Sequence, residues 1–217
     1  MILSTASIVA EVPPWFGATK QGGWTTCDYV MLPASTPRRK DWPKLGHTDS
    51  RGTEIQRIIG RSLRAVIDLT KIGPHTIHVD CQVLQADGGT RTASICAAWL
   101  ALNDALSKLP RELPPEQKQN NPNYDPKRGL VDQLAAVSVG IVEGEVRVDL
   151  DYHDDSRADV DLNVAYTASG KFVEVQGSAE KCAGFDRKRL DEMLDAAEEA
   201  CKKILEIQTA CDNRQFR

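Results

Sequence analysis

Alternating apolar and polar residues predict extended strands in several parts of the chain. The clearest case is the segment 77–84, in which the apolar Ile77, Val79, Cys81 and Val83 alternate with the polar His78, Asp80 and Gln82. A period of two places one face of a strand in the core. The same pattern predicts strands at residues 1–10 and 24–32 and two hairpins. The arms of the hairpins fall at residues 134–142 with 145–150, and at 160–167 with 171–175.

Three other segments repeat apolar residues every three or four positions, which is typical of a helix with one buried face. The first opens at residues 51–54 and is expected to end at the Gly73-Pro74 pair. The second runs from about 92 to 109. The third begins after Asp186, whose carboxylate can cap it. Strand runs separated by long helices predict an α+β fold rather than strict alternation of strands and helices.

Residues 110–128 interrupt this pattern. They contain five prolines and a polar stretch at 117–121. Proline fixes the backbone and removes a hydrogen-bond donor, so this composition favours a loop or insertion. We expect no chemistry there.

Composition narrows the class of protein. The chain has 217 residues, of which 41% are hydrophobic and 27% charged, as in an ordinary globular protein. Its net charge of −4 offers no general attraction for polyanions, so any contact with nucleic acid must come from local patches. The six cysteines form no Cys-x-x-Cys pair, which disfavours zinc and favours a reducing compartment. Because no apolar run has membrane-spanning length, we expect a cytoplasmic protein without a membrane partner.

A glycine turn lies between the strand at 77–84 and the helix at 92–109. It carries an arginine at the helix start, and its residues are Gly88, Gly89, Thr90 and Arg91. Glycines let a backbone approach a ligand closely, and the free N–H groups of a helix start attract anions. We interpret this turn as a phosphate site, although it lacks the P-loop pattern. The alternative is a tight loop with a surface arginine.

Six aspartates lie within 13 residues of one another. They are Asp149, Asp151, Asp154, Asp155, Asp159 and Asp161. Alternation predicts that the first two share one strand face and the last two another. Crowded carboxylates repel one another unless a cation lies among them, and such oxygen ligands suit Mg²⁺ or Mn²⁺. The alternative is an exposed acidic loop.

A basic stretch follows the second predicted strand. It contains Arg38, Arg39, Lys40 and Lys44, with Trp42 beside them. Such a loop can hold an RNA backbone and stack a base, or it can simply be solvated. A phosphate site, arginines and an acidic metal site together suggest phosphoryl transfer.

Four motifs, in the same order along the chain, closely resemble the bacterial ribonuclease PH family. They are Glu-Ile-Gln-Arg-Ile-Ile-Gly-Arg-Ser-Leu-Arg-Ala at 54–65, Val-Leu-Gln-Ala-Asp-Gly-Gly-Thr-Arg-Thr-Ala-Ser at 83–94, Asp-Asp-Ser with Asp-Val-Asp-Leu-Asn-Val at 154–164, and Val-Glu-Val-Gln-Gly at 173–177. The resemblance covers residues 4–204. It implies the α+β ribonuclease PH fold, which is similar to domain 2 of ribosomal protein S5 and combines mixed sheets with helices. We expect one such domain across residues 1–217.

The resemblance also implies an activity and its residues. Members are phosphorolytic 3′→5′ exoribonucleases that trim tRNA 3′ ends with inorganic phosphate and release nucleoside diphosphates. The phosphate-binding positions of the family match Arg51 and the triplet Gly89, Thr90 and Arg91. Two family aspartates match Asp155 and Asp161, which are expected to bind Mg²⁺ (or Mn²⁺) or to protonate the leaving group.

The resemblance further implies contacts and assembly. Arg39 matches a family arginine that contacts tRNA, with Arg38 and Lys40 beside it, whereas a neighbouring arginine position is Ala34 here. The partners implied are tRNA and other RNA 3′ ends, together with further copies of the chain in a homohexamer built from dimers.

The family carries a few tens of residues before the segment that matches Met1, including a strand that pairs with residues 1–10. We therefore expect an N-terminally truncated form, or a misassigned start, with an exposed sheet edge. Two alternatives to the enzyme follow from this. One is a non-catalytic RNA-binding ring subunit similar to those of the exosome, and the other is a truncated product without activity.

Overall fold

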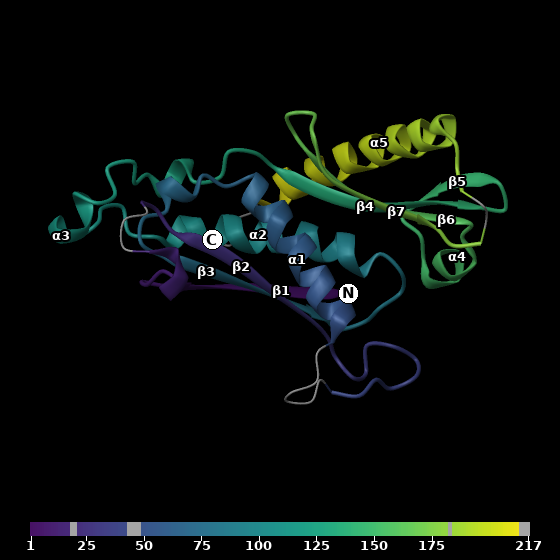
Figure 1. Cartoon of the computed structure of the whole chain (residues 1–217), viewed down its shortest axis with the longest axis horizontal. Helices are drawn as coiled ribbons and strands as arrows, with labels where there is room; N and C mark the ends of the chain where they lie inside the picture. The colour runs from purple at the N-terminus through teal and green to yellow at the C-terminus, as the bar shows by residue number, and fades with distance from the viewer. Residues whose placement is uncertain (18–20, 43–48, 182–183, 213–217) are drawn as a thin grey trace.

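The structure is a computed structural model, which describes residues 1–17, 21–42, 49–181 and 184–212. Four layers follow one another in Figure 1. They are helix α5, an antiparallel sheet, the helices α1 and α2, and a second sheet that carries the N-terminus. This architecture confirms the predicted α+β class. Among the helices of the described residues, none is both long and apolar enough to cross a membrane.

The sheet that carries the N-terminus has three strands in the order β1-β3-β2. The strands are β1 (Ile2–Val9), β2 (Trp24–Met31) and β3 (Thr76–Val83). β1 pairs antiparallel with β3, and β2 pairs parallel with it. The alternation in the sequence is confirmed, because Ile77, Val79 and Cys81 are buried beneath the helices. β1 lies at an edge of this sheet.

The other sheet is antiparallel and has the order β5-β4-β6-β7. Its strands are β4 (Leu134–Val142), β5 (Glu145–Val148), β6 (Val160–Thr167) and β7 (Phe172–Ala179). Every residue of β4 is buried, because α2 covers one face of the strand and α5 covers the other. β4 pairs antiparallel with β5, and β6 pairs antiparallel with β7, so both predicted hairpins are confirmed.

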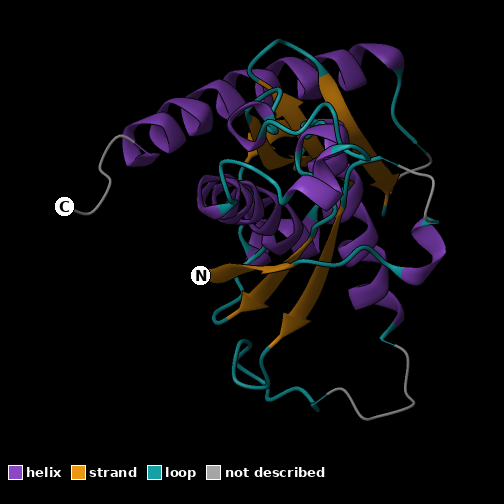
Figure 2. Ribbon diagram, turned by 90° about the vertical axis from the view of Figure 1, so that its left-hand side faces the viewer, coloured by secondary structure: helices purple, strands orange, loops and turns teal. Residues whose placement is uncertain are grey.

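Three long helices support the sheets, as Figure 2 also shows: α1 (Ser50–Ala65), α2 (Thr90–Lys108) and α5 (Arg187–Asp212). α2 contacts strands of both sheets, and one hydrophobic cluster contains residues from both. Asp186 caps α5 as predicted, since its carboxylate accepts a hydrogen bond from the Arg189 amide at 2.8 Å.

The predicted end of the first helix at Gly73-Pro74 is wrong. α1 ends at Ala65, and Val66 leaves the helical conformation with φ −116°. The next residues pair with a distant loop instead: the Val66 carbonyl accepts from the Val131 amide at 2.9 Å, and the Asp68 amide donates to Gly129 at 2.8 Å. Tertiary backbone pairing thus overrides the local helical pattern.

Residues 110–128 are mostly loop, as predicted, and contain two short helical turns, α3 (Pro115–Lys118) and a 3-10 turn at Pro126–Arg128. Their role is structural in part. The buried Asn121 accepts the Gly22 amide at 3.0 Å and so ties this segment to the start of β2.

One close contact joins the two sheets near the start of α2. Gly88 has φ +69°, and a Cβ atom at this position would lie 2.1 Å from the Leu150 carbonyl oxygen. The backbones of the glycine turn and of residues 150–151 therefore touch, which only glycine permits.

We predict that Gly88→Ala destabilises the protein by about 1–2 kcal/mol for the left-handed backbone and by about 1–3 kcal/mol more for the clash. Urea unfolding measures both effects. Gly144→Ala is the matched control, because Gly144 also has a positive φ of +81° but open space where the Cβ would lie. Equal losses of stability in the two variants would show that the close contact is unimportant.

Candidate active site

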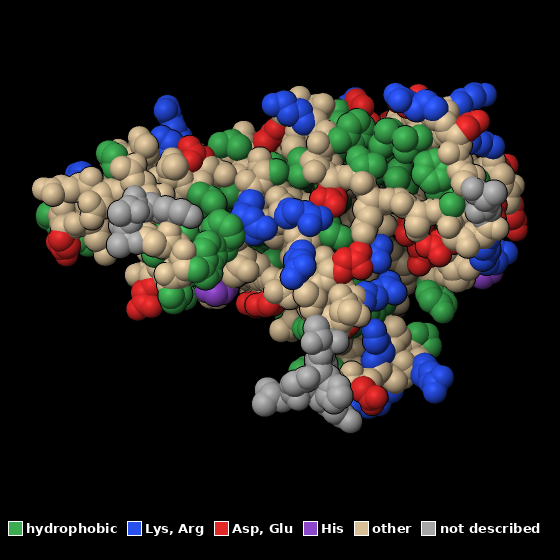
Figure 3. All heavy atoms as spheres, viewed as in Figure 1, with side chains coloured by type: hydrophobic (Ala, Val, Ile, Leu, Met, Phe, Trp, Pro, Cys, Tyr) green, Lys and Arg blue, Asp and Glu red, His purple; other side chains and the backbone are tan. Residues whose placement is uncertain are grey.

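A cavity of about 930 Å³ opens where the two sheets meet. Residues far apart in the sequence line it: the loop after β2, the first turn of α1, the glycine turn with the start of α2, and parts of β6 and β7. The short helix α4 (Tyr152–Arg157) contributes as well. Figure 3 shows basic and acidic side chains gathered next to each other on the face that carries these elements.

The glycine turn places a helix start in the cavity. Gly89 is the N-cap of α2 with φ +52°, so the helix begins at Thr90, two residues earlier than predicted. The first N–H groups of a helix have no intrahelical acceptor and carry partial positive charge. Thr90 is held in place by the Tyr29 hydroxyl, which donates to its Oγ1 at 3.0 Å.

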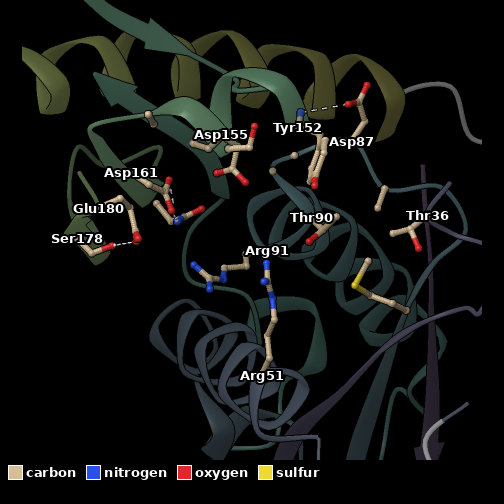
Figure 4. Close-up of a pocket in the computed structure, with 18 of the residues that line it drawn as sticks. Thr36, Arg51, Asp87, Thr90, Arg91, Tyr152, Asp155, Asp161, Ser178 and Glu180 are labelled. Atoms are coloured by element: carbon tan, nitrogen blue, oxygen red, sulfur yellow. Dashed lines mark hydrogen bonds between the residues drawn. The ribbon is translucent and has the colours of Figure 1, made fainter. Parts of the chain in front are cut away.

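Two guanidinium groups reach the same space from two helices. Arg91 lies in the first turn of α2 and Arg51 in the first turn of α1, where Asp49 caps the helix by accepting the Gly52 amide at 3.0 Å. Figure 4 shows Arg51 extending into the cavity from below, with the side chain of Arg91 lying beside its guanidinium group. The Nε of Arg91 is buried without a hydrogen-bond partner, which leaves a donor for a ligand.

The positive charges of Arg51 and Arg91 also act on the buried side chain of Tyr29. Burial raises the pKa of its phenol, while the hydrogen bond with Thr90 and the charges of Arg51 and Arg91 act in the opposite direction. Both guanidinium charges therefore act on the side chain that holds the start of α2.

Two of the six aspartates face these arginines. Asp161 lies on β6 and Asp155 on α4, and both line the cavity opposite Arg51 and Arg91 (Figure 4). Burial raises the pKa of Asp161, the charge of Asp155 raises it further, and Arg91 lowers it. Burial and the neighbouring charge of Asp155 therefore both disfavour the ionised form of Asp161.

Among the other aspartates, Asp149 and Asp151 were predicted to share one face of a strand, and this prediction is wrong. β5 ends at Val148, Asp149 takes a left-handed conformation with φ +59°, and Asp151 caps α4 by accepting the Asp154 amide at 2.7 Å. A helix turn thus replaces the expected strand, because the capping carboxylate satisfies the free amides.

Asp154 is neutralised by arginines outside the cavity. Its carboxylate accepts from Arg147 at 2.8 Å, and Arg157 lies 3.5 Å away. The Arg147 hydrogen bond is the main reason that the pKa of Asp154 is low. Asp151, His153 and Asp154 are close enough to hold an ion, but they are mostly exposed and this pairing already balances Asp154.

The basic loop approaches the cavity only in part. Arg38 and Lys40 line it, whereas the exposed Arg39 does not. Lys44 lies outside the described residues. The loop therefore puts positive charge at one side of the cavity, where it can meet a phosphate backbone.

Sequence reasoning missed several lining residues, among them Glu54, Tyr152 and Gln176. Gln176 on β7 donates to the Glu54 carboxylate at 2.6 Å and so joins β7 to α1 across the cavity. Glu54 stands one helical turn after Arg51, and this spacing was the available signal for it. No local signal pairs it with Gln176, which is 122 residues away.

Comparisons with known proteins identify the family of the chain. The sequence pattern of the 3′ exoribonuclease family, domain 1, matches residues 1–108, and that of domain 2 matches residues 132–200. A ribonuclease PH of Mycolicibacterium gilvum is 50% identical over 210 residues, which are 96% of this chain and 76% of the relative. A ribonuclease PH of Rhodopirellula baltica is 47% identical over 210 residues, 97% of this chain and 82% of the relative.

Solved structures show the same fold at lower identity. An archaeal exosome core chain has a TM-score of 0.68 at 21% identity and covers 96% of this chain and 76% of its own. Rice Rrp46 has a TM-score of 0.69 at 13% identity, with coverages of 96% and 81%. Together with the two domain matches and the relatives of nearly 50% identity, this places the chain in the 3′ exoribonuclease family, ribonuclease PH type.

Proposed function

We propose that this chain is a phosphorolytic 3′→5′ exoribonuclease that trims RNA 3′ ends, those of tRNA among them. The observation that carries the proposal is the cavity itself, in which two guanidinium groups and a helix start face a pair of carboxylates. A sequence identity near 50% to ribonuclease PH supports it. The two guanidinium groups and the two carboxylates are all present in this chain, which argues against a non-catalytic ring subunit.

Inorganic phosphate is the nucleophile in this proposal. Arg51, Arg91 and the amides at the start of α2 bind it, and the hydroxyl of Thr90 lies beside them. Fixing the phosphate next to the RNA end makes the attack effectively intramolecular. The guanidinium groups also stabilise the charge that develops on the phosphoryl oxygens.

The reaction exchanges one P–O bond for another. A phosphate oxygen forms a bond to the phosphorus of the last phosphodiester, and the bond from that phosphorus to the 3′ oxygen of the preceding ribose breaks. The 3′ oxygen takes up a proton. The products are a nucleoside diphosphate and an RNA one nucleotide shorter.

Asp155 and Asp161 fit a divalent cation. Their donors are hard carboxylate oxygens that line one cavity, and the pKa of Asp161 is raised first by burial and then by the charge of Asp155, both of which a bound cation would offset. Bound Mg²⁺ or Mn²⁺ would supply charge neutralisation at the leaving oxygen. The carboxylates themselves define the wall of the cavity opposite the arginines, and so they fix the direction in which the RNA end lies.

The body of the RNA lies along the basic loop in this proposal, where Arg38 and Lys40 contact its backbone and Arg39 extends the positive surface outward. We also propose that the chain is a single functional domain and that six copies assemble into a homohexamer, as a trimer of dimers. A chain of an archaeal exosome core has the same fold, with a TM-score of 0.68. The free cysteines suit a reducing compartment such as the cytoplasm.

We predict that Arg91→Ala lowers phosphate-dependent release of nucleoside diphosphates roughly 100-fold or more, because a buried cationic donor to the nucleophile is lost. Affinity for RNA, measured by fluorescence anisotropy without phosphate, should change by less than about threefold, since one backbone charge contributes little. Arg57→Ala is the matched control, as Arg57 lies on α1 but outside the cavity. Normal turnover in Arg91→Ala would remove the phosphate site.

A second prediction concerns the acidic pair. Asp161→Asn should lower kcat roughly 100-fold and raise the Mg²⁺ concentration needed for half-maximal activity, because one hard ligand loses its charge. The KM for phosphate should change little. Asp154→Asn is the control, since that carboxylate pairs with Arg147 away from the cavity. If both variants respond alike to Mg²⁺, the cation is not bound by Asp161.

A further inference from the structure

The proposed function assigns residues to the phosphate, the cation and the RNA backbone, but none to the nucleobase that leaves with each turnover. The described residues that line the cavity include one aromatic side chain, Tyr152. Its exposed fraction is 69%, which is high for a large ring on an ordered helix. An aromatic face left open in a cavity is available to a flat ligand.

The backbone of Tyr152 is fixed at both sides. It is the first residue of α4 after the Asp151 cap, and its amide donates to the Asp87 carboxylate of the glycine turn at 3.1 Å. Asp155 follows one helical turn later, so the ring and the proposed cation ligand share one rigid element. Figure 4 shows Tyr152 at the top of the cavity, between Asp155 and Asp87 and above Thr90.

This position suits the last nucleotide of the RNA. The base at a 3′ end is attached to the ribose next to the phosphodiester that is attacked, so it must lie close to Asp155 and to the bound phosphate. Stacking on an aromatic ring is tolerant of sequence, because every base offers a flat face. An exonuclease that removes each of the four nucleotides in turn needs such a contact rather than base-specific hydrogen bonds.

We propose that the ring of Tyr152 forms a subsite that stacks the 3′-terminal nucleobase and so positions the last phosphodiester. This inference rests on the proposed function. It also differs from the expectation that Trp42 stacks a base, because Trp42 is exposed but does not line the cavity.

The test combines the full chain with two RNAs that differ only in the last residue, a uridine in one and an abasic ribose in the other. Tyr152→Ala should lower kcat/KM about tenfold on the uridine RNA, mainly through KM, and should leave the abasic RNA unaffected. Tyr152→Phe, which keeps the ring, should restore most of the loss. The KM for phosphate should stay the same in all variants.

Two results would overturn the proposal. Equal losses on both RNAs in Tyr152→Ala would mean that the substitution only disturbs α4 and Asp155. A base-dependent loss in Trp42→Ala, with none in Tyr152→Ala, would place the stacking contact on the loop instead.

A binding measurement separates this inference from the proposed activity. RNA ending in 2-aminopurine, added without phosphate, should lose fluorescence when the base stacks in the wild-type protein, and should keep it in Tyr152→Ala. Arg91→Ala, which is expected to lose phosphorolysis, should still quench. Quenching without any nucleoside diphosphate production would support the subsite while the proposed function fails, and an unquenched wild-type protein would refute the subsite.

Discussion

The site depends on one contact between two backbones. At Gly88 the turn that opens α2 touches the Leu150–Asp151 segment, so closely that a Cβ atom would lie 2.1 Å from a carbonyl oxygen. One side of this contact continues into the helix start with Arg91, and the other continues into α4 with Asp155. The hydrogen bond from Tyr152 to Asp87 reinforces the same junction. The position of the helix start with Arg91 relative to α4 with Asp155 is therefore set largely by a main-chain contact.

The charged side chains that line the cavity would be better compensated with a ligand bound than they are in the empty protein. A chain with net charge −4 concentrates two guanidinium groups at one helix junction and two carboxylates opposite them. The buried Nε of Arg91 has no partner, and the pKa of Asp161 is raised. A buried donor without a partner and a buried carboxylate each cost stability, and the proposed phosphate and cation would offset these costs. Elsewhere the same residue types are paired, as Asp154 is with Arg147.

The sequence predicted the strands well because burial of one face imposes a period of two that is visible in the residues. It predicted the glycine turn and the helix start after it, because adjacent glycines between a strand pattern and a helix pattern indicate a tight turn. Phosphate binding at this turn stays a prediction. The sequence failed where distant backbone decides: α1 ends at Ala65 because Val66 pairs with Val131. It also failed among the aspartates, since capping by Asp151 turns the expected strand into α4. The hydrogen bond between Glu54 and Gln176 could not be predicted from the local sequence pattern.

Two of the exposed aromatic residues, Trp42 and Tyr152, illustrate what only the three-dimensional structure can decide. Trp42 and Tyr152 have similar exposed fractions, 58% and 69%, and both stand beside charged residues in the sequence. The residues near Trp42 suggested RNA because they are basic, whereas those near Tyr152 are acidic and suggested only metal. Folding brings Arg51 and Arg91 to the same cavity as Tyr152, from 101 and 61 positions away in the sequence (152 − 51 and 152 − 91). An aromatic ring in acidic sequence can therefore face a polyanion when the positive charge that attracts it comes from other elements.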